Sequence, residues 1–137
     1  MDLKTVIQSQ YFASLAMLKQ AIVRCPSSVW DSPDDRDKAW FKAYHTLYYA
    51  HKYLQINPRD FVPWRKHHKP DSEEPITKDE ALEYLVFVEQ EVAERIPMID
   101  LEAGAGFLGN QFNKMELQFI KISRIGLRAQ GLAQRKR

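Results

Sequence analysis

A histidine and two arginines carry the most distinctive chemistry in this sequence. His45 lies within AYHTLYYAHKYL, toward the edge of the apolar stripe of that segment, and Arg124 and Arg128 are four residues apart in MELQFIKISRIGLRAQGL. This spacing places two side chains on one face of a helix, here in line with Leu117 and Ile120 and leaning toward the rest of the fold. Because a guanidinium is always protonated and has no lone pair, the two arginines predict a site for a carboxylate, phosphate or sulfonate rather than for a metal ion.

Two other interpretations of these side chains stay open. The arginines can lie exposed at the end of the chain, or they can form buried ion pairs with Glu83, Glu89 or Asp100 from another helix. No acidic residue follows Glu116, and cations in the last turns of a helix complement its dipole without any ligand. A histidine placed like His45 is also common as a core or boundary residue.

The remaining histidines and the cysteine form no reactive pattern. His51 follows His45 by six residues, a spacing that points two helical side chains in different directions. His67 and His68 lie in a basic stretch flanked by prolines, which we expect to be a solvated loop. Cys25 has no second cysteine with which to close a disulfide. The sequence also lacks a Ser-His-Asp pattern, a glycine-rich phosphate loop and a pair of catalytic carboxylates.

Composition limits the class of protein. The 137 residues fit a single domain over 1–137, and 45% of them are hydrophobic, which is enough to build a core. A net charge of +2 is far from the excess expected of a protein that binds nucleic acid. The first ten residues do not resemble a signal peptide, and no apolar run reaches the ~20 residues that a membrane-spanning helix needs. We therefore expect a cytoplasmic protein with no nucleic-acid or membrane partner.

Four periodic segments must position the candidate residues. The first covers about 5–23, and the second begins near Ser32-Pro33 and ends before Pro58. The third begins at the capping box Thr77-Lys-Asp-Glu80 and is kinked or ended by Pro97, and the fourth covers about 113–134. The prolines between 57 and 75 predict a long connection without a regular helix. These features predict an all-α fold, a four-helix bundle with a long crossover between its second and third helices.

Apolar residues at steps of three and four define the face that each of the first three helices buries. These residues are Ile7, Tyr11, Leu15, Leu18 and Ile22 in the first helix, Trp40, Tyr44, Leu47, Tyr48, His51 and Leu54 in the second, and Leu82, Leu85, Val86, Val92, Ala93 and Ile96 in the third.

Two stretches resemble a known family of small helical proteins. Trp40, the run AYHTLYY over 43–49 and Tyr53-Leu54 resemble the second helix of the DinB-like (DinB/YfiT) superfamily of four-helix bundles. The later pattern is similar to the approach of that family into its last helix; it consists of Ala105-Gly106-Phe107, Phe112, Lys114, Glu116-Leu117-Gln118, Ile122 and Leu132. Together with the helix lengths and the crossover, the resemblance covers nearly the whole chain.

The resemblance implies a metal centre and shows where this chain departs from it. In the family a divalent metal, commonly zinc or nickel, is held by one histidine on the second helix and two at i and i+4 on the last. His45 matches the first ligand, whereas Arg124 and Arg128 stand where the other two should be. Family members are implicated as metal-dependent transferases that use low-molecular-weight thiols.

Three hypotheses follow, and they leave open whether the protein is an enzyme. The first is a DinB-like protein with a degenerate metal site, which binds a small anionic ligand near His45, Arg124 and Arg128 or has no catalytic activity. The second is a transferase that uses a low-molecular-weight thiol and a divalent metal, Zn or Ni, with His45 as a metal ligand. The third is an interaction protein; a homodimer formed through an exposed apolar surface is expected of small bundles.

Overall fold

The computed structural model describes residues 2–33, 38–55, 57–64, 66, 74–104 and 112–134. Helices make up all of the regular structure in these ranges, and the one strand-like feature is an isolated bridge between Gly104 and Asn113. The all-α class predicted from the sequence is therefore confirmed for this part of the chain. None of the helices that the structure describes is both long enough and apolar enough to cross a membrane.

The first helix, α1 (Leu3–Arg24), follows its predicted apolar stripe. The Asp2 side chain caps it by accepting a hydrogen bond from the Lys4 amide. All five stripe positions, from Ile7 to Ile22, are completely buried. The chain leaves the helix at Cys25, and Pro26 then starts the short helix α2 (Ser27–Trp30).

The second long helix, α3 (Ala39–Tyr53), begins later than the sequence predicts. The expected N-cap, Ser32, instead closes α2, because its amide donates to the carbonyl oxygen of Val29. Residues 34–37 lie outside the described ranges, and Lys38 occupies the N-cap position without a side-chain hydrogen bond. The predicted stripe of this helix is otherwise confirmed, with Tyr48 as its one half-buried member.

The third long helix, α4 (Lys78–Arg95), confirms its start and corrects its buried face. Both hydrogen bonds of the capping box between Thr77 and Glu80 are present, and the chain turns into the 3-10 helix η3 (Ile96–Met98) at Pro97. Val86 and Ala93 were expected in the core but are exposed. Each follows a buried residue and so lies about 100° around the helix from it. Ala81, Tyr84 and Val88 are buried instead.

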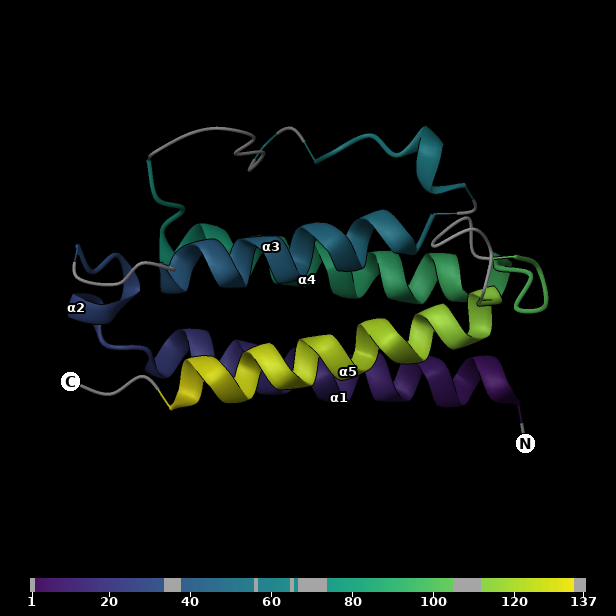
Figure 1. Cartoon of the computed structure of the whole chain (residues 1–137), viewed down its shortest axis with the longest axis horizontal. Helices are drawn as coiled ribbons and strands as arrows, with labels where there is room; N and C mark the ends of the chain where they lie inside the picture. The colour runs from purple at the N-terminus through teal and green to yellow at the C-terminus, as the bar shows by residue number, and fades with distance from the viewer. Residues whose placement is uncertain are drawn as a thin grey trace.

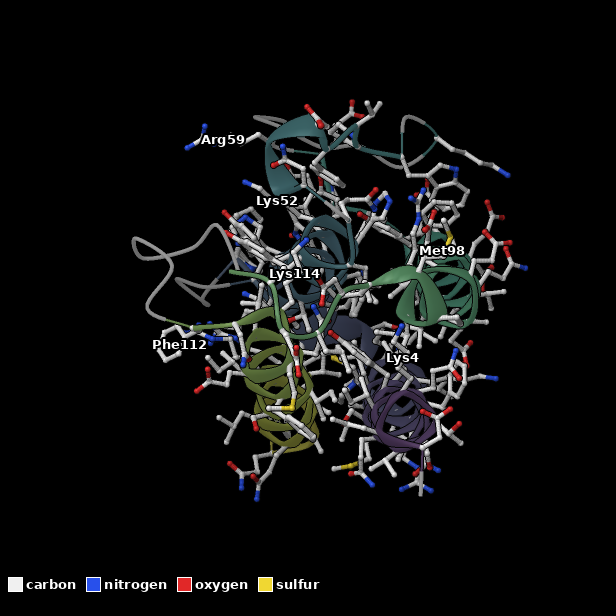
Figure 2. All side chains as sticks on the ribbon, turned by 90° about the vertical axis from the view of Figure 1, so that its right-hand side faces the viewer. Lys4, Lys52, Arg59, Met98, Phe112 and Lys114 are labelled. Atoms are coloured by element: carbon white, nitrogen blue, oxygen red, sulfur yellow. The ribbon has the colours of Figure 1, made fainter. Side chains whose placement is uncertain are left out.

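The last helix, α5 (Lys114–Ala133), starts as predicted, with a capping box between Asn113 and Glu116. Helices α1 and α3 each pack against both α4 and α5. Seen along the helices in Figure 2, α1 and α5 form the lower pair and α3 and α4 the upper pair. The colours in Figure 1 show that α3 and α5 run in opposite directions. The N-terminal part of α3 therefore faces the C-terminal part of α5.

The described parts of the connection from α3 to α4 lie on the outer side of these two helices (Figure 1). They contain the 3-10 helix η1 (Pro58–Asp60). The Phe61 ring packs edge-on against Tyr48, with ring centroids 5.3 Å apart. The Trp64 ring stacks on Phe87 of α4 at 4.3 Å. The described part of the connection thus covers the α3/α4 side of the molecule.

Candidate functional site

A groove between α3 and α5 brings the three predicted site residues together. It encloses a cavity of about 440 Å³, and His45, Arg124 and Arg128 all line it. The antiparallel course of the two helices (Figure 1) fits this arrangement, in which the charge of Arg128 on α5 acts on His45 of α3. We call this cavity the α3/α5 groove.

The described residues that line the α3/α5 groove include no acidic side chain. Its basic members come from both helices, and these are Lys42, His45, Lys121, Arg124 and Arg128. Its aromatic members come from α3 alone, and these are Phe41, Tyr49 and Tyr53. Thr46, Ala50 and Ile125 complete the lining. The groove therefore combines flat apolar surfaces with several hydrogen-bond donors that carry positive charge.

Lys121 is the most deeply placed cation of the groove, with only 7% of its surface exposed. Its Nζ atom lies 4.3 Å from the centroid of the Tyr53 ring and 5.7 Å from that of Tyr49, within range of cation–π attraction. Burial lowers the pKa of Lys121 to about 8, and the positive charges of Arg124 and Lys52 add to this effect. Burial and the neighbouring cations thus destabilise the protonated form of Lys121.

His45 lies at the other end of the groove, where its side chain is exposed. Its ring centroid is 4.1 Å from that of Phe41 and 5.5 Å from that of Tyr49. Partial burial lowers the pKa of His45, and the nearby Arg128 guanidinium lowers it further. A neutral imidazole at pH 7 follows, with one nitrogen able to donate a hydrogen bond and one able to accept.

Arg124 and Arg128 are exposed along α5 and border the groove rather than entering the core. The helix continues to Ala133, so neither arginine lies at a frayed end. The buried ion pairs considered from the sequence do not form within the described residues: Glu83 binds Lys66 at 2.6 Å, and no carboxylate there pairs with either arginine.

The residues of the groove do not fit a zinc or nickel site. His45 is the single imidazole, thiol or carboxylate donor among the described lining residues, and a structural or catalytic zinc normally has at least three protein ligands. Nor does any other place in the described ranges bring three such donors together. The charged group that acts on His45 is the Arg128 guanidinium, which repels a divalent ion.

His51 lies on the opposite side of α3 and does not join His45. Only 4% of its surface is exposed, and its ring packs edge-on against Phe61 and Phe87. Its Nε2 atom is 3.8 Å from a Glu91 oxygen, and the other oxygen of Glu91 accepts from Arg95 Nε at 2.8 Å. Burial lowers the pKa of His51, Glu91 raises it and Arg95 lowers it. We refer to these five residues as the His51 cluster.

Several predictions fall outside the described residues. The loop histidines His67 and His68, the Ala105–Phe107 part of the family resemblance and the last three basic residues belong to this group.

The site residues predicted from the sequence did not include Lys121, Lys42, Tyr49 or Tyr53. A spacing signal for all four was present. Lys121 precedes Arg124 by three residues and Arg128 by seven, which places it on the same face of α5. Lys42, Tyr49 and Tyr53 share a face of α3 with His45 by the same rule.

No family model, curated protein or solved structure matches this chain. The function is therefore argued from the groove itself.

Proposed function

We propose that this protein binds a small anionic molecule in the α3/α5 groove. The observation that carries the proposal is the charge of the lining: the described residues include four cationic side chains beside the neutral His45, and no acidic one. Proteins normally place carboxylates beside clustered cations, and the described lining residues of α3 and α5 include none. A carboxylate, sulfonate or phosphate on the ligand would provide the missing negative charge.

The geometry favours a ligand of defined shape. Arg124 and Arg128 offer planar, forked donors that match a carboxylate or phosphate, and their separation of four residues places both on the same side of the groove. Phe41, Tyr49 and Tyr53 form an apolar surface beside these cations. An anion attached to a flat ring suits this arrangement better than an inorganic ion does.

We also propose that the four long helices form a four-helix bundle of the DinB/YfiT type. The position of His45 opposite Arg128, and the packing of α1 and α3 against both other long helices, support this architecture. In this proposal the arginines replace two metal ligands and convert a metal site into an anion site. The homodimer, the cytoplasmic location and the absence of a nucleic-acid partner stay predictions.

Calorimetric titration with benzoate, phosphate and sulfate at low ionic strength tests the proposed function. We expect benzoate to bind, and we expect its affinity to fall at least tenfold, about 1.4 kcal/mol, in the variant R124Q/R128Q. The matched control, R24Q/R59Q, removes the same charge from two exposed arginines outside the groove and should bind benzoate like the unaltered protein.

Two results would contradict the proposal. Equal affinities in both double variants would show that the groove is not the binding site. One equivalent of zinc or nickel in the purified protein, lost in H45A, would instead support the thiol-dependent transferase with His45 as a ligand. Elemental analysis by plasma mass spectrometry provides this second measurement.

A further inference from the structure

Two lysines of the described chain are almost completely buried, and their surroundings differ. Lys114 is 8% exposed; burial lowers its pKa, and the carboxylate of Asp100 partly opposes this effect. Lys121 is 7% exposed and has Arg124 and Lys52 as its charged neighbours. The second environment is the one that favours a neutral amine, because desolvation and neighbouring cations both oppose protonation.

The amine of Lys121 lies in a cavity large enough for a small molecule. Its residue lines the α3/α5 groove, and its Nζ atom lies over the Tyr53 ring. With a pKa of about 8, a sizeable fraction of this amine carries a free electron pair at pH 8. At the same pH, a lysine with the ordinary pKa of 10.5 is unprotonated about a hundred times less often.

The groove has two ends with separate roles. Arg128 and His45 interact at one end, whereas Lys121 lies seven residues earlier on α5, roughly 10 Å along the helix axis. Arg124 lies between Lys121 and Arg128 on α5, and its charge lowers the pKa of Lys121 together with that of Lys52. An anion held at the Arg128 end leaves Arg124 free to keep the amine unprotonated.

We propose that Lys121 is a nucleophilic amine that forms an imine with an aldehyde whose anionic group binds at the Arg128 end of the groove. The inference rests on the proposed function, because the anion positions the carbonyl group. The nitrogen lone pair attacks the carbonyl carbon, and the oxygen takes up the proton that the nitrogen loses. The resulting carbinolamine then loses its hydroxyl group and the remaining proton on nitrogen as one water molecule, which leaves a carbon–nitrogen double bond and needs no oxidant or reductant.

Reductive trapping followed by peptide mass spectrometry tests this inference on the unaltered protein. The probe is 4-formylbenzoate with sodium cyanoborohydride at pH 8, and the matched probe is the neutral 4-formylbenzamide. We expect 4-formylbenzoate to label Lys121 on the order of ten times faster than Lys114 or Lys52. The neutral probe should label Lys121 several-fold more slowly, and R128Q should reduce the rate with 4-formylbenzoate to the rate with the neutral probe.

The controls separate reactivity from binding. The variant K121R keeps the charge and should lose the label, while mapping on the unaltered chain does not depend on whether that variant folds. The α-amino group has an ordinary pKa near 8 and is counted as a separate peptide. Labelling at equal rates on Lys121, Lys114 and Lys52 would overturn the inference. If benzoate binds but Lys121 is not labelled, the inference fails and the anion site stands; if neither occurs, both fail.

Discussion

The two histidines of α3 occupy environments that differ mainly in the charge facing them. His51 is buried against α4, where the Glu91 carboxylate lies between its imidazole and the Arg95 guanidinium. His45 is exposed toward α5, where its charged neighbour is Arg128. One helix thus carries a histidine beside a carboxylate on one side and, on the other, a histidine in a groove whose described lining is cationic.

This difference separates structural charges from charges that await a ligand. The His51 cluster provides its own counterion, and the ring contacts of Phe61 and Phe87 enclose it. The α3/α5 groove has no described counterion, so the folded protein bears the repulsion among its cations. Sites that sacrifice stability in this way are commonly functional. The contrast predicts opposite responses when a charge is removed from each side.

The largest expected effect comes from removing the counterion of the His51 cluster. The variant E91Q should lower the free energy of unfolding by about 2 kcal/mol, because Arg95 loses its ion pair and the buried His51 loses its charged neighbour. Urea denaturation followed by circular dichroism measures this. The control E94Q, at an exposed position of the same helix, should change stability by less than about 0.5 kcal/mol. R124Q in the groove should leave stability unchanged or slightly higher, and a loss equal to that of E91Q would contradict the comparison.

The sequence predicts the helices better than it predicts these environments. Hydrophobic spacing and the capping box at Thr77 locate α1, α4 and α5, since both signals are local. The predicted start of α3 is wrong because Ser32-Pro33 fits the pattern of a helix start, whereas the Ser32 amide closes α2 by donating to the Val29 carbonyl oxygen. The predicted burial of Val86 and Ala93 is wrong because an apolar residue at the edge of a helical stripe fits the hydrophobic spacing whether it is buried or exposed.

The candidate site was only partly predictable for a related reason. The spacing of Arg124 and Arg128 indicates a shared face, and the resemblance indicates His45 as their companion. Burial of Lys121 and the approach of Glu91 to His51 depend on which helices become neighbours, and that is a tertiary property. Local sequence signals carry no information on how far a cation is removed from solvent.

The next effect is a dependence of stability on pH that arises from Lys121. Its pKa is about 8 in the folded protein and near 10.5 in the unfolded chain, so the unfolded chain binds more protons between these values. The free energy of unfolding should therefore rise as the pH increases from 7 to 9.5, by about 2 kcal/mol. Denaturation curves at several pH values measure this rise.

The variant K121M serves as the control for this pH dependence and should remove the rise. Tyr53 does not interfere below pH 10, because burial and Tyr49 raise its pKa above the ordinary value of 10.0. A raised tyrosine pKa lowers stability as the pH increases through the alkaline range, which is the opposite sign. A curve that is flat or falling from pH 7 to 9.5 in the unaltered protein would show that Lys121 is not held in a cationic environment.

The smallest effect concerns the two imidazoles themselves. Removing the positive charge in R128Q should raise the pKa of His45 toward its ordinary value, because Arg128 is the charged group that lowers it. R124Q should leave this pKa unchanged, since Arg124 acts on Lys121 instead. R95Q should raise the pKa of His51, because Glu91 would then act on the imidazole without an opposing cation. NMR titration of the imidazole Cε1 protons reports both groups in one sample. If R124Q raised the pKa of His45 as much as R128Q does, both arginines would act equally on His45. The separate anion and amine ends, on which the imine proposal depends, would then not exist.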